Sequence, residues 1–350
     1  MVKIMRDHTG LLLAAAVVLL LPAVLESGTL ATEVLVYALA VLGCNLLLGY
    51  TGLLSFGQGI FFGMGSYAVG ILMTRAGLPL PAAVLASIAV GAVVAGLVGW
   101  FAIRQRGTYF VMLTLAFAQM FYFLAYSLPS WTGGDNGLLD IPRPPLALGG
   151  LTLMRLDTPW RFYALVGICF LLVFWLLQRV TESVFGRTLL AIRENEARAR
   201  AVGYDTRALK LAVFALSGAV TALAGAFHAL MTGIAPLSNI EYHTSEMILV
   251  MTVIGGTGNL FASVLGAAFY VLVSDWLSTL WPRWLMLLGF LLIAVSLFMH
   301  KGLWGLGERL WAARRRTSEP GAGTVTGTAT GGAGSATESA AAGQARKETR

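Results

Sequence analysis

The chain has 350 residues, of which 57% are hydrophobic and 12% are charged, and its formal net charge is +7. A soluble globular protein carries about 25% charged residues. A chain this apolar could not cover its surface with polar groups, so we expect an integral membrane protein. A spanning helix needs about 20 apolar residues, which predicts an all-α, polytopic fold of about ten transmembrane helices. The expected spans are roughly 9–25, 30–49, 58–74, 79–103, 107–128, 160–178, 209–232, 246–256, 259–280 and 284–300.

The two ends of the chain differ in character. The first span has a basic head and an apolar middle, as a signal peptide does, but it lacks a clean A-x-A site, so we expect an uncleaved helix. One transmembrane domain is expected over 1–305. The tail over 317–350 is rich in Gly, Ala, Thr and Ser, which predicts a disordered cytoplasmic segment. Segment 246–256 is short for a span, so it is either broken or continuous with its neighbour.

Basic residues are unevenly distributed between the two sides of the membrane. If the spans alternate from an inside N-terminus, the "RQR" at 104–106, the loop 179–210 and the flank 301–316 all lie inside. The opposite side receives only Arg75, Arg143, Arg155, Arg161 and Arg283. This asymmetry predicts that both termini are cytoplasmic. Nucleic-acid binding is disfavoured, because the charge is spread over membrane-flanking loops.

The residues that would carry enzymatic or ion-coupled chemistry are sparse. The chain has no G-x-x-x-x-G-K-[ST] phosphate loop, which argues against an ATPase site of its own. Cys44 and Cys169 lie within predicted spans and are interpreted as small buried residues. His228 is interpreted as a polar helix contact. The acidic residues in or near spans fall at predicted outer ends, where interfacial positions are expected: Glu33, Glu246 and Asp275. No cofactor or metal is expected on this chain.

The stretch over 45–71 combines glycine with polar side chains inside an apolar segment. The "GYTG" and "SFGQG" sequences predict a turn or re-entrant piece before a helix from Gln58, with Ser55 as its N-cap. Helix packing alone is one interpretation; a polar translocation path is the other, and it is the one we favour. Ser217 and Thr221 share a helix face with Gly225, which forms a close-packing seam or, alternatively, a path wall. The predicted path residues are Asn45, Thr51, Gly52, Ser55, Gln58, Ser66, Ser217 and Thr221.

Two further patterns concern the connections between spans. The sequence G-x-T-G-x-L occurs at 49–54 and again at 255–260, a faint internal repeat. The inner loop predicts a single amphipathic helix over 188–203. Leu189, Ile192, Ala199 and Val202 would share its apolar side, and Glu194 would pair with Arg198 four residues on. Such a helix lies either on the lipid surface or against a cytoplasmic protein.

Several segments taken together resemble a known family. They are "NLLLGYTGLLSFGQGIFFGMGSYA", "TYFVMLTLAFAQMFYFLA" with "WTGGDNGL", "FGRTLLAIRENEARARAVGYDTRALKLAVFALSGAVTALAGA", "MILVMTVIGGTGNLFASVLGAAF" and "KGLWGL". In this order, over about 40–306, they resemble the longer permease subunit of bacterial branched-chain amino-acid ABC importers. The resemblance implies a multi-pass subunit of the bacterial cytoplasmic (inner) membrane that forms the translocation path and is not itself an enzyme.

The resemblance also implies partners and a coupling site. The partners are a second permease subunit, two cytoplasmic ATPase subunits and a periplasmic or extracellular binding protein that delivers the substrate. The helix over 188–203 would be the coupling helix seated in an ATPase groove. "ENEARARAVG" is similar to the E-A-A…G loop of ABC permeases, but Gly203 lies seven residues after Glu196 and no I-x-L-P follows. The implied coupling residues are Arg193, Glu194, Glu196, Arg198, Arg200 and Gly203.

Other functions stay open at this point. Related permeases carry urea, short amides or other amino acids. An ion-coupled secondary transporter would need an ionisable group or cation site within the membrane, and a channel would need a selectivity filter. A membrane enzyme would need clustered catalytic side chains, whereas the four histidines at 8, 228, 243 and 300 are scattered.

Overall fold

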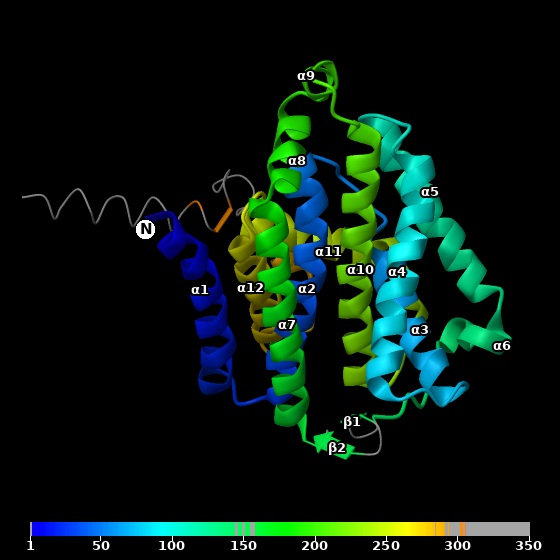
Figure 1. The fold of residues 1–350 in the computed structure, drawn as a ribbon. Helices are drawn as coiled ribbons and strands as arrows, with labels where there is room; N and C mark the ends of the chain where they lie inside the picture. The colour runs from blue at the N-terminus through cyan, green and yellow to red at the C-terminus, as the bar shows by residue number, and fades with distance from the viewer. Residues whose placement is uncertain are drawn as a thin grey trace, which may run out of the picture. The chain divides into compact units, whose positions relative to one another are not determined.

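The computed structural model describes residues 2–143, 146–148, 151–154, 158–283, 285–290, 293, 302–303 and 305. Within them the chain forms a bundle of helices with one short β-hairpin (Figure 1). The longer helices are α1 (Val2–Val24), α2 (Gly28–Thr51), α3 (Gln58–Thr74), α4 (Leu80–Ala102), α5 (Thr108–Tyr126), α7 (Pro159–Glu182), α10 (Thr206–Thr232), α11 (Tyr242–Gly255) and α12 (Leu260–Leu280). The shorter elements are α6 (Pro129–Thr132), η1 (Gly134–Asn136), β1 (Leu146–Leu148), β2 (Leu151–Met154), α8 (Val184–Glu194), α9 (Glu196–Ala201) and η2 (Leu237–Asn239).

The helices confirm the polytopic all-α fold. Among the described residues, six helices are long and apolar enough to cross a membrane: α2, α4, α5, α7, α10 and α12. Helix α3 has 17 residues and α11 has 14, and the apolar part of α1 covers Gly10–Val24. The predicted count of ten spans is therefore not confirmed. Most of the predicted span 284–300 and the whole of the tail 317–350 lie outside the described residues.

Helices α2 and α10 form the centre of the bundle. The apolar stretch of α2 is 83% buried and that of α10 is 61% buried, against 22% for α5. Helix α10 packs against α2, α3 and α4. A Cβ on Gly225 would collide with the carbonyl oxygen of Phe62, and one on Gly65 would collide with the backbone of Ala222. Such close approach of backbones is how small residues hold helices together in lipid, where no hydrophobic force drives them.

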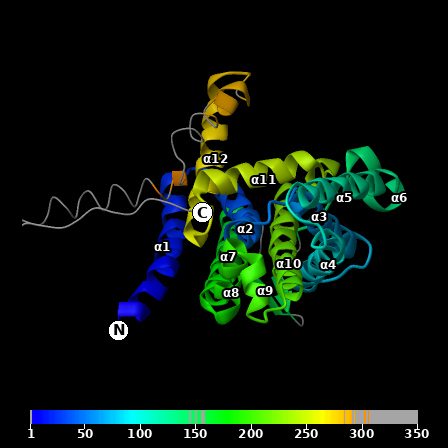
Figure 2. The same cartoon turned by 90° about the horizontal axis from the view of Figure 1, so that it is seen from above.

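Helix α11 crosses the bundle instead of running along it. Figure 2, seen from above, shows α11 along its length, while α2 and α10 are viewed nearer to end-on. Helix α11 packs against α2, α3 and α12 and reaches α5. The predicted segment 246–256 is thus a separate helix, shorter than the spanning helices and different in direction from α2 and α10.

The connection between α2 and α3 differs from the prediction in one respect. The N-cap of α3 is Gly57, and Ser55 does not cap the helix. The Ser55 hydroxyl instead accepts a hydrogen bond of 3.1 Å from the Gly57 N–H, closing a turn. An N-cap directly precedes the first helical residue, here Gln58, and Ser55 lies two residues before that N-cap position.

A long loop follows α5, and its strands β1 and β2 lie at the opposite end of the bundle from α8 and α9 (Figure 1). In it β1 pairs antiparallel with β2. The loop is fastened to the segment after α10, because Leu138 and Ala235 exchange two backbone hydrogen bonds of 3.0 and 2.8 Å. This pairing ties the loop after α5 to the segment between α10 and α11.

Candidate functional site

The connection between α7 and α10 contains two helices, which we call the loop helices, α8 and α9. The predicted single helix over 188–203 is wrong, because Asn195 interrupts it with an extended backbone of φ −158° and ψ 99°. The Asn195 side chain accepts a hydrogen bond of 2.9 Å from the Arg198 N–H and so starts α9 as a new helix. Ser183 caps α8 in the same way. Gly203, the last residue of the predicted helix, lies after the end of α9 with φ 98°.

The interruption changes which side chains face the bundle. Leu189, Ile192 and Ala199 are buried, as the amphipathic pattern predicts. Val202 is 73% exposed, so its predicted place on the apolar side is wrong. Glu194 ends α8 and Arg198 belongs to α9, so they are not an i,i+4 pair of one helix. The outward surface of the loop helices therefore presents an apolar side chain, Val202, four residues after an exposed cation, Arg198.

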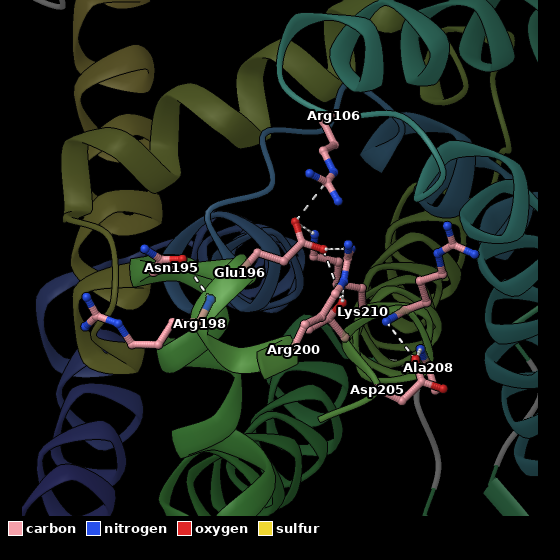
Figure 3. Close-up of polar contacts among 10 residues, drawn as sticks. Arg106, Asn195, Glu196, Arg198, Arg200, Asp205, Ala208 and Lys210 are labelled. Carbon is pink, nitrogen blue, oxygen red and sulfur yellow. Dashed lines mark hydrogen bonds and ion pairs between the residues drawn. The ribbon is translucent and has the colours of Figure 1, made fainter. Parts of the chain in front are cut away.

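Glu196 is the electrostatic centre of the loop helices. Its carboxylate lies 2.6 Å from the Arg200 guanidinium and 2.9 Å from the Lys210 ammonium group, and 4.0 Å from Arg106 in the α4–α5 loop. Figure 3 shows Glu196 with Arg106 on one side and Arg200 and Lys210 on the other. The Thr206 hydroxyl donates a further hydrogen bond of 3.2 Å to Glu196. Since Lys210 belongs to α10, this cluster fastens α9 to the central helix of the bundle.

The cluster favours the ionised form of Glu196. Partial burial works against ionisation, but the hydrogen bond and charge of Lys210, and then the charge of Arg200, outweigh it. The pKa of Glu196 is therefore lowered from its ordinary value of 4.5. The Lys210 side chain is only 9% exposed, so this carboxylate compensates a nearly buried cation.

Arg193 fastens α8 to the bundle at a second point. Its guanidinium donates a hydrogen bond to the carbonyl oxygen of Gly49, at the end of α2. The same side chain passes beside Gly52 and Gly258. These two glycines close the turns of the repeated G-x-T-G sequence with φ values of 71° and 91°, a left-handed conformation that glycine adopts without strain. The two copies of the repeat thus meet around one arginine.

Asn45 holds these two turns together from inside. Its amide donates hydrogen bonds of 2.8 Å to the Asn259 carbonyl oxygen and to the Ser263 hydroxyl. Its own oxygen accepts one of 3.0 Å from the Gly258 N–H. Asn45 is 0% exposed, and both of its amide hydrogens and its oxygen bond to the start of α12 and the turn before it, so its side chain joins α2 to α12.

A second buried network joins α2, α3 and α10. The Gln58 amide donates a hydrogen bond of 3.1 Å to the Ser217 hydroxyl and accepts one of 2.8 Å from the Thr221 hydroxyl. Ser217 donates one of 2.6 Å to the Gly43 carbonyl oxygen. Farther along α3, Ser66 donates to the Gly225 carbonyl oxygen at 2.8 Å and accepts from Asn239 at 3.1 Å.

The predicted path residues therefore form internal contacts. Seven of the eight are buried within the chain, and Gly52 is exposed. Thr51 bonds back to the Leu47 carbonyl oxygen within its own helix at 2.5 Å. Their place on a translocation path stays a prediction. The structure adds partners that sequence reasoning missed: Lys210, Asn239, Ser245, Asn259 and Ser263.

Only one of these missed residues gave a signal in the sequence. Lys210 is a cation within the predicted span 209–232, and a charged residue in a span is by default a functional position. Asn239 and Asn259 look like ordinary loop residues until the fold brings them to their partners. Among the described residues, no group of three or more His, Cys, Asp or Glu could hold a metal ion.

The arrangement defines a multi-pass membrane protein with a separately fastened pair of loop helices at one end of its bundle. Residues 28–296 match the family described as branched-chain amino acid transport system, permease component. The chain belongs to this family, which confirms the resemblance recognised from its sequence segments. It is therefore a permease component of the ABC transporter class.

Two curated relatives have the same printed name, high-affinity branched-chain amino acid transport system permease protein LivM. The chain is 29% identical to LivM of Escherichia coli strain K12 over 306 residues, which is 81% of this chain and 71% of the relative. It is 28% identical to LivM of Salmonella typhimurium strain LT2 over 299 residues, 79% of this chain and 69% of the relative.

A relative that is named for another cargo matches the chain over a similar length. The chain is 27% identical over 322 residues to the autoinducer 2 import system permease protein LsrC of Escherichia coli strain K12 / DH10B, covering 85% of this chain and 89% of the relative. No solved structure shows a significant match to the chain.

Proposed function

We propose that this chain is the membrane-spanning subunit of an ATP-driven importer of branched-chain amino acids. Cytoplasmic ATPase subunits would dock on the outward surface of α9, and a second permease subunit would complete the translocation path. A binding protein on the other side of the membrane would deliver the substrate. In this orientation the loop helices, and with them both termini, lie in the cytoplasm of a bacterial cell, as the distribution of basic residues favours.

The observation that carries the proposal is the fastening of α9 to α10 through Glu196. An ATPase that moves α9 would displace Lys210 with it, because the two side chains are 2.9 Å apart and the ammonium group is nearly buried. Helix α10 packs against α2, α3 and α4, so its movement would reach most of the central bundle. Arg193 provides a parallel connection from α8 to the end of α2. Both connections suit a lever between a motor and a pathway.

The choice of cargo rests on the relatives. The LivM relatives are named for branched-chain amino acids and LsrC for autoinducer 2. The chain is slightly more identical to LivM, at 29% against 27%, which supports branched-chain amino acids as the cargo. Urea, short amides and other amino acids stay as alternatives. The modest polar inventory of the buried networks suits a path with weak, transient contacts, in which the binding protein sets selectivity.

The test of docking uses Arg198→Glu on the outward surface of α9, with Arg161→Glu as the matched control. Arg161 is also exposed, but it lies at the opposite end of α7. We expect Arg198→Glu to weaken association with the ATPase subunits and to abolish ATP-driven uptake, while the control keeps both. Wild-type association and uptake in Arg198→Glu would overturn the assignment of the docking surface.

The test of function is uptake by the complete importer in proteoliposomes. Leucine, isoleucine and valine should accumulate only with ATP and the binding protein, and urea, acetamide and autoinducer 2 should not. Preferred uptake of urea, acetamide or autoinducer 2 would replace the assigned cargo with that compound. Accumulation by this chain alone, driven by an ion gradient or a membrane voltage, would instead establish a secondary transporter and overturn the proposal.

A further inference from the structure

A groove of about 400 Å³ lies between the end of α4 and the start of α10. Its walls carry both charged and apolar groups. Arg104 and Arg207 contribute two cations, and Gly99, Ile103 and Leu211 contribute apolar surface. Trp100 also lines the groove, and the Arg104 guanidinium carbon lies 5.6 Å from the centre of its indole ring. The groove therefore combines a basic rim with an apolar floor.

The charge balance of the groove favours an anion. Asp205 is the acidic residue that lines it. The Asp205 carboxylate already accepts hydrogen bonds of 3.1 and 3.2 Å from the Arg207 and Ala208 N–H groups, as the N-cap of α10. The two guanidinium groups thus leave a net positive charge, and the planar guanidinium matches the geometry of a phosphate.

The groove continues into an exposed apolar strip along α4. Val93, Leu97 and Trp100 lie on one face of the helix, with Arg104 one turn beyond them. Their exposures are 62%, 59% and 57%, so this face is not covered by the rest of the chain. Where no partner subunit covers it, such a face of a membrane protein would meet lipid, with the tryptophan and the arginine at the level of the headgroups.

We propose that this groove binds an anionic phospholipid, with its phosphate between Arg104 and Arg207 and an acyl chain along Val93 and Leu97. A soluble phosphate would use the rim alone and leave the apolar strip uncovered. A zwitterionic lipid would match the strip, but its headgroup would not neutralise the rim. Basic pockets between membrane-spanning helices are known to select acidic headgroups. The bound lipid would contact the same end of α10 that the Glu196 cluster fastens to α9.

The test measures lipid binding to the purified full chain by native mass spectrometry and by the shift in Tm. The probes are phosphatidylglycerol, phosphatidylcholine and glycerol 3-phosphate. The test variant is the double substitution Arg104→Gln with Arg207→Gln. The control is Arg179→Gln with Arg187→Gln, which removes the same charge from exposed positions and disrupts a similar arginine–tryptophan contact, that of Arg179 with Trp175.

We expect phosphatidylglycerol to bind the wild type and the control equally. It should bind the test variant about 25-fold more weakly, since each basic residue near an acidic lipid contributes about a fivefold factor. Arg104→Lys with Arg207→Lys should bind with intermediate strength, which separates loss of charge from misfolding. The proposal would be overturned if the test variant bound phosphatidylglycerol as strongly as the wild type, or if the control lost as much binding as the test variant. It would also be overturned if phosphatidylcholine or glycerol 3-phosphate bound the wild type as strongly as phosphatidylglycerol does.

Discussion

Replacing Glu196 with Gln tests whether the ion cluster holds the loop helices in place. The substitution keeps the size of the side chain and a neutral acceptor, but it removes the charge that Lys210 and Arg200 contact. A hydrogen bond to a charged group contributes about 1.5–3 kcal/mol, and the exposed pairs with Arg200 and Arg106 contribute about 0–1 kcal/mol each. Because glutamine keeps part of the hydrogen bonding, we expect the segment to lose about 2 kcal/mol of local stability.

Hydrogen exchange measures this loss directly. The N–H groups of Ala199 and Tyr204 are protected by backbone hydrogen bonds of 3.1 and 3.2 Å. A loss of about 2 kcal/mol makes local opening about 30-fold more frequent, so peptides covering 196–205 should exchange about 30-fold faster. Glu194→Gln is the matched control, since Glu194 is exposed and ends α8 two residues earlier. Unchanged exchange in Glu196→Gln, or equal acceleration in both variants, would refute the reasoning.

Four more predictions follow from the same contacts. Because the pKa of Glu196 is lowered in the fold, its contribution is complete above the ordinary value of 4.5 and is lost as the pH falls through the lowered pKa. The Tm difference between wild type and Glu196→Gln should thus be constant from about pH 7 to about pH 5 and shrink below that. Asn45→Ala removes the three hydrogen bonds of a buried side chain and should lower the free energy of unfolding by about 2–4 kcal/mol, measured by thermal unfolding in detergent. Gly225→Val forces a side chain into the backbone of α3 and should cost about 3 kcal/mol or more, whereas Gly96→Ala, with no atom within 4 Å of the new carbon, should be neutral. Arg193→Ala unties α8 from α2 and should reduce uptake per ATP hydrolysed while ATPase association persists.

Each of these four predictions has a contrary result. A Tm difference that grows on acidification would contradict the lowered pKa. An Asn45→Ala variant as stable as the wild type would show that its hydrogen bonds contribute no net stability. Equal stability losses in the two glycine variants would contradict close packing as the cause. Loss of ATPase association in Arg193→Ala would show that this residue belongs to the docking surface and does not act through its bond to α2 alone.

The apolar runs predicted the helices well, because a membrane-spanning helix must present about 20 apolar residues whatever its neighbours are. The segment 58–74 coincides with α3, and the ends of the other expected spans through residue 280 differ from the helices by at most four residues, except that α1 begins at Val2, seven residues before the expected span 9–25. The direction of α11 was beyond such a prediction. Helical periodicity defines a segment but not its angle to the bundle, which depends on packing against α2, α3 and α12.

The candidate site was predicted in part. The sequence indicates the importance of the loop over 188–203 and of Glu196, but it allows two charge pairs at helical spacing. Glu194 with Arg198 and Glu196 with Arg200 are equally plausible in a continuous helix. The break at Asn195 decides between them. Asparagine is a favoured N-cap residue, but it also occurs inside helices, so its presence alone does not fix a break at this position. The partners of Asn45 lie more than 200 residues away, where no local pattern reaches.

That separation has a consequence for how the protein is made. Asn45 enters the bilayer with α2, whereas the two groups that its amide donates to are 214 and 218 residues farther along the chain. At about 5–20 residues per second, a ribosome takes roughly 10–40 s to supply them. During that interval the Asn45 amide of the nascent chain lies in or near the membrane without the two acceptors that it bonds in the folded protein. A transcript truncated ahead of α12 would yield a polypeptide permanently in this state, a natural substrate for membrane quality control.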